Sequence, residues 1–389
     1  MKAKKINSIK KQIKWNLVIE SEEELSLYEQ VLEDVLNYLD SNSKATFQEI
    51  VKYVNGNDRR TLRLLDQLVK NNFITFDYPN FKLLETTLCQ EITPNSVRCP
   101  LCDSKMIYTN GALKDISLIM EEIFSNKFDP TFVFDQRPVN CETSMKRAGY
   151  MVLRGDIKDK SIAVVGDDDL TSVAIALTRL ANRITLFEID ERIINFVQEI
   201  SKRYNLDIEV VNVDLTEGIP PIYQCKFDVY TTDPTPTEAP FTVFTNQCLS
   251  LLKNGARKVG YSSIYPSCKL KLIDIQKILT QMDFMITDLI PYFTQYDFVL
   301  HTYNNKDRAL LEKYAAREEK ISFYEYLLRC ETTSKTKKVD VHYSKKELVG
   351  SATMRVLKDP SKDPVLSTNY YDANIQRYLD DLKKEISNE

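Results

Sequence analysis

Apolar residues near the start of the chain recur at helical spacing. They fall three or four positions apart over Glu22–Leu39, and shorter stretches of the same kind cover Thr46–Val54 and Asp58–Val69. The next stretch, Phe73–Leu84, alternates apolar and polar residues around a Pro-Asn pair, as a β-hairpin does. Three helices followed by a hairpin predict a winged-helix domain, which we assign to residues 1–90.

Short apolar runs alternate with helical patterns over residues 151–305, which we assign to a second domain. The predicted strands are 161–165, 183–188, 208–213, 227–232, 258–262, 284–289 and 298–302, and the predicted helices are 171–180, 191–204, 240–252 and 270–281. Such alternation is typical of an open, mostly parallel sheet with helices on both faces. The last two strands are close in sequence, which predicts an antiparallel hairpin at the sheet edge. The fold class is therefore α/β, in the methyltransferase variant of the Rossmann-like fold.

The other segments carry weaker patterns. Residues 91–150 are interpreted as a linker that contains one helix, near 111–126. Residues 306–389 are interpreted as a helical, partly flexible C-terminal segment. One or two helices are expected at 303–327, and an amphipathic helix is expected at 373–386. We favour surface decoration for this segment over a segment that orders on a ligand.

Composition excludes several classes of protein. The chain has 389 residues with a formal net charge of −4, so no overall field favours nucleic acid. No apolar run approaches the roughly 20 residues of a membrane span, and no apolar stretch of a secretory signal follows the lysine-rich start. Eight scattered cysteines fit reduced thiols in a cytoplasm. With only two histidines in the chain, histidine-based catalysis is not expected.

A Cys-x-x-Cys pair, Cys99 and Cys102, supplies half of the ligand set of a zinc ribbon. No second pair follows, so Cys89 and Cys141 would have to fold close to it to complete a four-thiolate site. We favour a degenerate ribbon or buried thiols, with zinc at Cys99 and Cys102 as the alternative. No metal ligands are therefore assigned.

The third predicted helix of the winged-helix domain carries Arg59, Arg60 and Arg63, which Asp58 and Asp66 offset in charge. Winged helices often bind DNA, but many serve as dimerisation or substrate-capping modules. We do not favour nucleic acid as a partner, and a homodimer formed through this domain is one option.

The heptapeptide Gly166–Ser172 (GDDDLTS) carries the strongest chemical signal in the chain. It follows the predicted strand Ser161–Val165 and precedes a helix, as in nucleotide-binding α/β units. Its three consecutive carboxylates repel one another, so we expect either a cationic ligand or a carboxylate that takes up a proton. The alternative is a solvated acidic turn that caps the following helix.

Further acidic residues follow the next strands, where this fold binds its ligand. Glu188 and Asp190 end the second strand and suit ribose hydroxyls, and Asp214 ends the third and suits an adenine amino group. Asp233 ends the fourth strand, in an Asp-Pro-Thr sequence that can position a nitrogen nucleophile. Together they predict an adenosine-type cosubstrate, and the surplus carboxylates favour amines without a carboxylate. Decarboxylated S-adenosylmethionine is such a ligand, with a polyamine as its acceptor.

The chain resembles the branched-chain polyamine synthases, also called bis(aminopropyl)spermidine synthases. The matching elements are Val164–Ser172, Phe187–Arg192, Thr232–Pro234 and Phe134–Gln136, within a stretch that covers about residues 130–305. The resemblance implies aminopropyl transfer from decarboxylated S-adenosylmethionine to the central secondary amine of spermidine, with release of methylthioadenosine. A second transfer would give a quaternary ammonium product.

Each acidic residue receives a predicted role in such a reaction. Asp168 or Asp169 would deprotonate the attacking amine, and Asp233 would bind it. The donor would be held by Gly166, Asp167, Glu188, Asp190 and Asp214. No tightly bound cofactor is predicted. Tyr230, Tyr261 and Tyr292 could also line the amine site, although packing within the strands explains them better.

Two other functions fit parts of the sequence. A methyltransferase that uses intact S-adenosylmethionine on a small amine or nucleic acid would share the fold and the Asp-Pro element. A non-catalytic regulator would combine DNA binding with polyamine sensing. The anionic loop disfavours a methyltransferase, because the carboxylate of the intact donor would be repelled.

Overall fold

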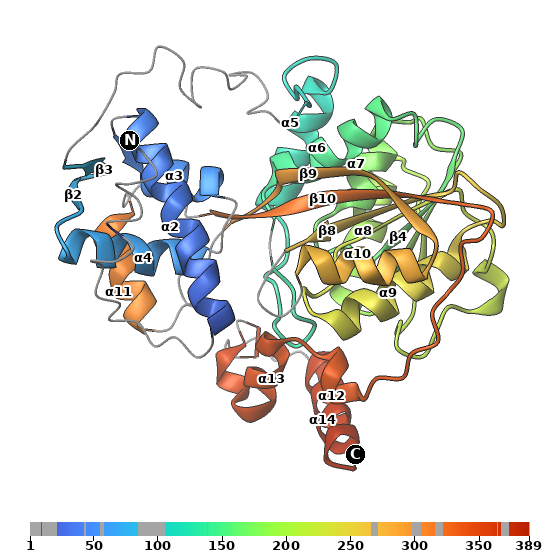
Figure 1. Ribbon diagram of the computed structural model, residues 1–389. Helices are drawn as coiled ribbons and strands as arrows, with labels where there is room; N and C mark the ends of the chain where they lie inside the picture. Colours follow the sequence, from blue (N-terminus) through green and yellow to red (C-terminus); the bar gives the residue numbers. More distant parts are fainter. Residues whose placement is uncertain are drawn as a thin grey trace. The chain divides into compact units, whose positions relative to one another are not determined.

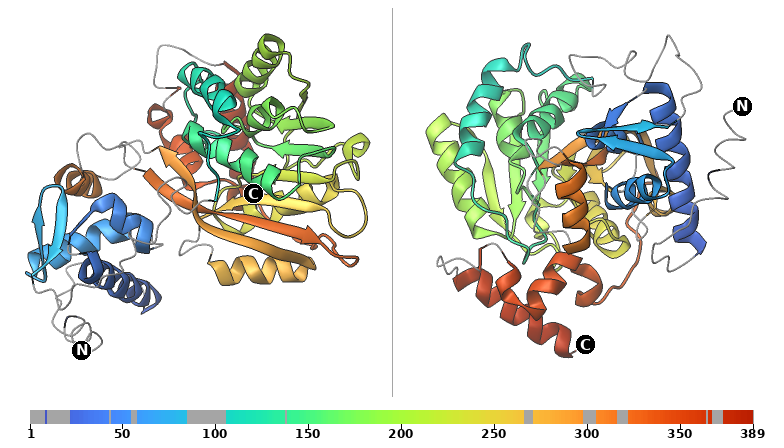
Figure 2. Two further views of the ribbon diagram at one scale, coloured as in Figure 1. Left: turned by 90° about the horizontal axis from the view of Figure 1, so that it is seen from above. Right: turned by 90° about the vertical axis from the view of Figure 1, so that its left-hand side faces the viewer.

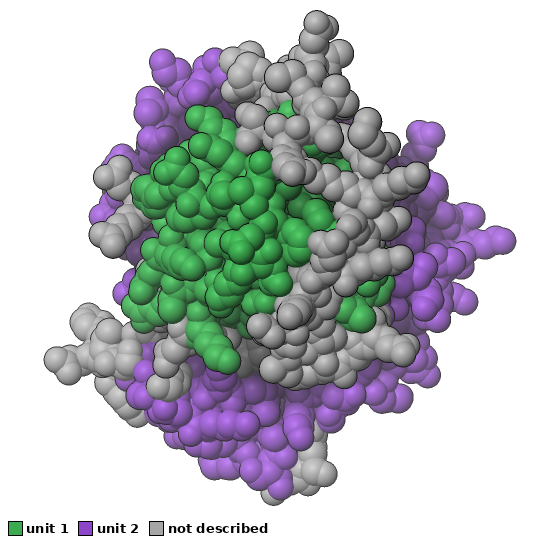
Figure 3. Space-filling view, turned by 60° about the vertical axis from the view of Figure 1, so that its left-hand side comes forward, with its two compact units in different colours: residues 1–104, 295–324 green, residues 105–294, 325–389 purple. Residues whose placement is uncertain are grey.

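The chain forms two compact units, and each is assembled from separate stretches of sequence (Figure 3). The first contains residues 1–104 and 295–324, and the second contains residues 105–294 and 325–389. The computed structural model describes residues 9, 22–42, 44–54, 58–84, 106–137, 139–265, 271–297, 305–315, 322–363, 365–366 and 373–388. This division differs from the four consecutive segments inferred from sequence, because residues 295–324 return to the first unit.

The first unit has the element order of a winged helix, as the sequence predicts (Figure 1). Its elements are α2 (Glu22–Asn42), β1 (Ala45–Thr46), α3 (Phe47–Val54), α4 (Asp58–Lys70), β2 (Ile74–Asp77), β3 (Asn80–Leu83) and α11 (Asn305–Tyr314). The three strands form a small antiparallel sheet in the order β1-β3-β2. Thr46 and Glu49 exchange hydrogen bonds at the start of α3, which satisfies amide groups of its first turn.

Helix α11 completes the core of this unit by packing on α4. Arg63 on α4 donates two hydrogen bonds, of 2.7 and 2.6 Å, to the carboxylate of Asp307 on α11. Tyr314 is fully buried and donates to Asp66 at 2.9 Å. The guanidinium of Arg60 lies over the ring of Tyr28. At least two of the arginines weighed as nucleic-acid contacts are therefore engaged within their own unit.

The second unit is built on a seven-stranded sheet. Its strands are β4 (Ser161–Val165), β5 (Arg183–Glu188), β6 (Glu209–Asn212), β7 (Val229–Thr232), β8 (Val259–Ile264), β9 (Phe284–Asp297) and β10 (Ser322–Thr332). The order is β6-β5-β4-β7-β8-β10-β9, in which β4 to β8 run parallel and β10 pairs antiparallel with β8. This arrangement confirms the predicted α/β fold of the methyltransferase type.

Strand β10 corrects one sequence prediction. The strand that pairs with β8 comes from Ser322–Thr332, part of which was predicted to be helical, and the strand predicted at 298–302 lies outside the described residues. Residues 325–330 are buried on both faces of the sheet, so their sequence lacks the alternation of a half-buried strand. A short run of this kind cannot be distinguished from a buried helix by periodicity.

Helices cover both faces of the sheet (Figures 1 and 2). The helices of this unit are α5 (Lys114–Ser125), α6 (Cys141–Leu153), α7 (Thr171–Leu177), α8 (Glu191–Tyr204), α9 (Glu238–Leu251), α10 (Leu272–Gln281), α12 (Lys345–Leu348), α13 (Ser351–Lys358) and α14 (Ala373–Asn388). Successive residues of β4 face opposite sides: Ile162 and Val164 join the core with α5 to α8, whereas Ala163 and Val165 join the core with α9 and α10. Within the described ranges, no helix has the length and apolarity that crossing a membrane requires.

Helix α6 was missed in the sequence, where residues 91–150 were interpreted as a linker. Its N-terminus is capped by Asn140, whose side chain accepts a hydrogen bond from the amide of Thr143 at 2.9 Å. The helix buries Lys146 and Arg147 together with apolar residues, so it shows no clear apolar stripe. Helices α13 and α14 share a further apolar cluster with Phe132 and Val133, which joins the C-terminal segment to the loop before α6.

The pairing of Arg63 with Asp307 yields a test of the first unit. Because Asp307 is buried, we expect Asp307→Asn to lower the free energy of unfolding by about 2 kcal/mol. Glu312→Gln on the same helix is the matched control, since it removes only an exposed ion pair with Arg308 and should have little effect. Urea denaturation of both variants measures the difference. Equal stabilities would contradict a structural role for this pair.

Candidate active site

The turn after β4 is held by its own first carboxylate. Gly166 adopts a positive φ of 68°, which favours glycine, and the chain then reverses into α7. The Asp167 side chain accepts hydrogen bonds from the amide of Thr171 at 2.6 Å and from both the amide and the hydroxyl of Ser172. The Asp167 carboxylate therefore caps the start of α7 from inside the fold. The sequence assigned this side chain to the donor instead, and gave helix capping only as an alternative role of a solvated turn.

Burial changes the chemistry of Asp167. Its side chain is almost completely inaccessible, and this burial raises the pKa of Asp167 to about 8. Its backbone N–H points the other way and donates to a carboxylate oxygen of Glu188 at 2.8 Å. Asp167 thus connects the ends of β4 and β5.

A buried arginine brings two of the predicted catalytic carboxylates together. Arg147 on α6 pairs through Nη1 with Asp169 and donates through Nη2 to Asp233 at 2.7 Å and to the Ser263 hydroxyl at 2.6 Å. Asp169 follows β4 and Asp233 follows β7, so the ends of two neighbouring strands share one cation. Sequence analysis did not identify Arg147, because nothing in the pattern of α6 separates it from the neighbouring Lys146.

Asp168 occupies a different position from its two neighbours. It forms no ion pair among the described residues, and its carboxylate accepts a hydrogen bond from the amide of Arg137 at 3.2 Å. Burial raises the pKa of Asp168 well above its usual value, and the charges of Asp169 and Asp233 add to the effect, while Lys127 opposes it. Asp168 therefore holds a proton more readily than an ordinary aspartate does, which suits a carboxylate that accepts a proton from a substrate.

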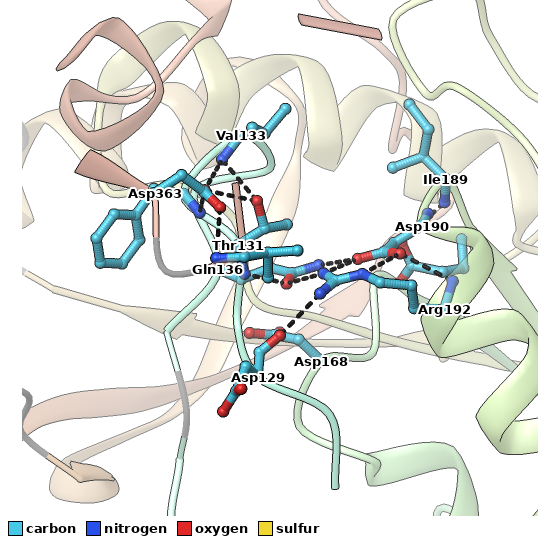
Figure 4. Close-up of polar contacts among 12 residues, drawn as sticks. Asp129, Thr131, Val133, Gln136, Asp168, Ile189, Asp190, Arg192 and Asp363 are labelled. Carbon is cyan, nitrogen blue, oxygen red and sulfur yellow. Dashed lines mark hydrogen bonds and ion pairs between the residues drawn. The ribbon is translucent and has the colours of Figure 1, made fainter. Parts of the chain in front are cut away.

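Glu188 and Asp190 are held at the end of β5. Glu188 accepts hydrogen bonds from the amides of Asp167, Ile189 and Asp190, at 2.8, 2.8 and 2.9 Å. Burial raises the pKa of Glu188 to about 7. Asp190 begins α8, where it accepts from the amide and guanidinium of Arg192 and from the side-chain amide of Gln136 (Figure 4). The predicted ribose carboxylates are thus adjacent, and both are fixed by several donors.

Asp214 follows β6, the edge strand that pairs with β5, the strand that ends at Glu188. Its carboxylate accepts hydrogen bonds from the amide and the hydroxyl of Thr216, at 2.8 and 2.7 Å. It lines an open pocket of about 520 Å³ whose walls continue through Glu217 and Ile219. The contact of Asp214 with an adenine amino group stays a prediction.

The tyrosines weighed for the amine site have structural surroundings. Tyr230 is buried on β7 and packs against Phe284 with the ring centroids 6.3 Å apart. Tyr261 is also buried and donates a hydrogen bond to Asp156, which in turn accepts from Arg329 at 2.8 Å. These contacts support packing as the explanation for Tyr230 and Tyr261.

Of the cysteines considered for zinc, Cys89, Cys99 and Cys102 lie outside the described residues. Cys141 is half-buried at the start of α6, and burial raises the pKa of its thiol to about 12. Among the described residues, no three or more His, Cys, Asp or Glu side chains are placed so that they could hold a metal ion together.

The raised pKa of Glu188 yields a prediction for stability. Its pKa of about 7 in the folded protein lies above the value of roughly 4.3 expected in the unfolded chain. The stabilisation that results is fully present below the pKa of Glu188 in the unfolded chain. It is lost as the pH rises through the pKa of Glu188 in the folded protein. Between about pH 4 and pH 8, the wild type should therefore lose up to about 3 kcal/mol of unfolding free energy relative to Glu188→Gln.

Urea denaturation at several pH values measures this loss. Glu199→Gln on the exposed face of α8 provides the control, since its stability should follow the wild type at each pH. Parallel pH profiles for the wild type and Glu188→Gln would contradict the prediction.

Comparison with known proteins identifies the family. The family described as "Branched-chain polyamine synthase A C-terminal domain" matches residues 115–352. The N(4)-bis(aminopropyl)spermidine synthase of Methanocaldococcus jannaschii is 34% identical over 243 residues, which are 61% of this chain and 68% of that protein. The synthase of the same name from Thermococcus kodakarensis is 29% identical over 282 residues, or 70% of this chain and 79% of that protein.

A solved structure has the same fold. The branched-chain polyamine synthase of Thermus thermophilus, in complex with N4-aminopropylspermidine and 5'-methylthioadenosine, superposes with a TM-score of 0.67 and 22% identity. The superposition covers 83% of this chain and 91% of that one. With the family match over more than half of its length, the chain belongs to the branched-chain polyamine synthase family.

Proposed function

We propose that this protein transfers aminopropyl groups from decarboxylated S-adenosylmethionine to the central secondary amine of spermidine or a related polyamine. The products are methylthioadenosine and a branched polyamine. The observation that carries the proposal is the group of three carboxylates, Asp168, Asp169 and Asp233, at the ends of β4 and β7 in a member of this family. Such a group suits cationic amines and disfavours a donor that carries a carboxylate of its own.

The donor site lies along the ends of β5 and β6 in this proposal. Glu188 and Asp190 would receive the ribose hydroxyls, and Asp214 would meet the adenine amino group beside its pocket. Asp167 would support this site indirectly, because its carboxylate is committed to the start of α7. We therefore assign Asp167 to the structure of the donor loop and assign direct contact with the donor to the other three carboxylates.

The reaction is an in-line displacement at the propyl carbon bonded to the donor sulfur. The lone pair of the acceptor nitrogen forms the new carbon–nitrogen bond, and the electrons of the carbon–sulfur bond go to sulfur. The positively charged sulfonium becomes the neutral thioether of methylthioadenosine. Since the leaving group is already activated, the protein mainly has to orient both partners and remove a proton from the amine.

We assign to Asp168 the role of the base that removes the proton from the acceptor amine. Asp169 shares Arg147 with Asp233, so both of these carboxylates already have a cation as their partner. Asp168 has no such cation bound to it among the described residues, and its pKa is raised by burial and by its neighbours. Asp233, at the start of its Asp-Pro-Thr sequence, is proposed to orient the attacking nitrogen.

A mass-spectrometric assay with two donors tests the function. Purified protein is incubated with spermidine and either decarboxylated or intact S-adenosylmethionine. We expect the acceptor to gain one or two aminopropyl groups with the decarboxylated donor alone, together with an equal amount of methylthioadenosine. Methyl transfer from the intact donor would make the protein a methyltransferase instead. The absence of product from both donors would contradict spermidine as the acceptor, and related polyamines are the next to be assayed.

The role of Asp168 is tested by Asp168→Asn, which keeps the size of the side chain and removes its basicity. We expect turnover to fall by about 100-fold or more, as for loss of a general base. Asp207→Asn serves as the control, since Asp207 is exposed and lies away from the strand ends that form the site. Wild-type turnover in Asp168→Asn would exclude Asp168 as the base.

The pH dependence follows from the same group. A base acts in its ionised form, so kcat/KM should rise with pH through the pKa of Asp168. Because that pKa is raised, the acid limb of the profile should lie well above the value of roughly 3.9 typical of aspartate. An acid limb at an ordinary aspartate pKa would contradict this assignment.

A further inference from the structure

We propose that Asp363, in the C-terminal segment, is a positioning residue for the donor site. It fixes the loop formed by residues 131–137, and through Gln136 of that loop it orients Asp190. The proposal rests on the proposed function in that Asp190 is taken to face the ribose of the donor. The contacts themselves are independent of which reaction the protein carries out.

Asp363 is fully buried, where it accepts hydrogen bonds from the loop at residues 131–133 (Figure 4) and from its own chain neighbours Val365 and Leu366. Its Oδ2 atom accepts hydrogen bonds from the hydroxyl of Thr131 at 2.7 Å and from the amides of Phe132 and Val133 at 2.6 and 3.3 Å. Its Oδ1 atom accepts from the amides of Val365 and Leu366, at 2.8 and 3.0 Å. In all of these contacts the two oxygens of Asp363 are acceptors. A segment that only decorated the surface would not need a buried aspartate with five such contacts.

Hydrogen bonds within the loop connect Asp363 to Asp190. Thr131, which donates to Asp363 through its hydroxyl, also donates through its amide to the side-chain oxygen of Gln136 at 2.9 Å. The nitrogen of the same Gln136 side chain donates to Asp190 Oδ2 at 2.8 Å. Arg192 contacts both Gln136 and Asp190, and it donates to the backbone oxygen of Asp129 at 2.9 Å. A continuous series of hydrogen bonds thus leads from Asp363 to a predicted ribose carboxylate.

The same loop contacts two other parts of the site. The amide of Arg137 donates to Asp168, the proposed base. Asp135 accepts a hydrogen bond from the hydroxyl of Thr235, two residues after Asp233. The backbone of the C-terminal segment lies directly against Asp135 at Gly350. A side chain at that position would not fit, because its Cβ atom would lie 2.1 Å from the Oδ2 atom of Asp135. Tyr378 on α14 packs on the ring of Phe134, with the centroids 4.9 Å apart. The segment therefore holds the loop at several points, with Asp363 as the polar one.

Asp363→Asn tests the anchor, because an amide nitrogen would face groups that are themselves donors. We expect the Kd for methylthioadenosine, measured by calorimetry, to rise about tenfold, the effect of losing one such hydrogen bond. Asp381→Asn, on the exposed side of α14, is the matched control and should bind like the wild type. If Asp363→Asn does not fold, Thr131→Val removes one donor to Asp363 and should show a smaller rise.

The route through Gln136 is tested by a double-mutant cycle. Gln136→Leu interrupts the series of hydrogen bonds but leaves the contacts of Asp363 with Phe132 and Val133. If Asp363 acts through Gln136, Asp363→Asn should weaken binding in the wild-type background and should have little further effect in Gln136→Leu. Equal and additive effects in both backgrounds, or unchanged binding in Asp363→Asn, would overturn the proposal.

Hydrogen exchange separates this proposal from the proposed function. In Asp363→Asn, backbone amides of both 131–137 and 188–192 should exchange faster than in Asp381→Asn, whether or not the protein transfers aminopropyl groups. Faster exchange confined to 131–137 would overturn the coupling. A wild-type protein without turnover or methylthioadenosine binding would instead reject the proposed function, and the exchange result would still decide the coupling.

Discussion

The structure of the second unit depends on one constraint, the burial of several carboxylates at one edge of a sheet. A buried carboxylate is costly unless donors or cations surround it. Each acidic residue here has a different solution. Asp167 uses the first amides of α7, Glu188 uses three backbone amides, and Asp169 shares Arg147 with Asp233. Within the described part of the chain, Asp168 has only the backbone amide of Arg137 as a hydrogen-bond donor, because the nearby cation Arg147 is bound by Asp169 and Asp233. This difference leaves Asp168 as the carboxylate suited to accept a proton.

The sequence predicted the elements whose patterns are local. The strands β4 to β8 follow from short apolar runs between helical stretches, and the acidic residues that end them follow from the same register. The winged helix follows from three helical patterns and a hairpin. Family resemblance was carried by the loop sequences, because those residues have chemical rather than packing constraints. The spacing of residues along the chain was therefore sufficient to predict these strands, helices and loops.

Other parts of the site could not be obtained in this way, because they depend on contacts between distant residues. Arg147 is one of two adjacent cations, and only the packing of α6 on the sheet brings it to Asp169 and Asp233. Asp363 lies in a segment rich in Pro, Ser and Lys, where an aspartate is typical of exposed turns, yet it is fully buried. Strand β10 lacks alternation because both of its faces are covered. In each case the tertiary environment, and not the local pattern, decides the role.

The division of the chain between two units has a consequence for biosynthesis. Leu311, Tyr314 and Ala315 belong to the core of the first unit, but they follow the parallel strands of the second in sequence. On the ribosome, the N-terminal helices therefore emerge long before the helix that completes their core. Until then the face of α4 that α11 covers exposes apolar side chains, at the stage when β4 to β8 are being synthesised. Because the second unit in turn requires residues 325–389, neither unit can complete its folding until most of the chain has been translated.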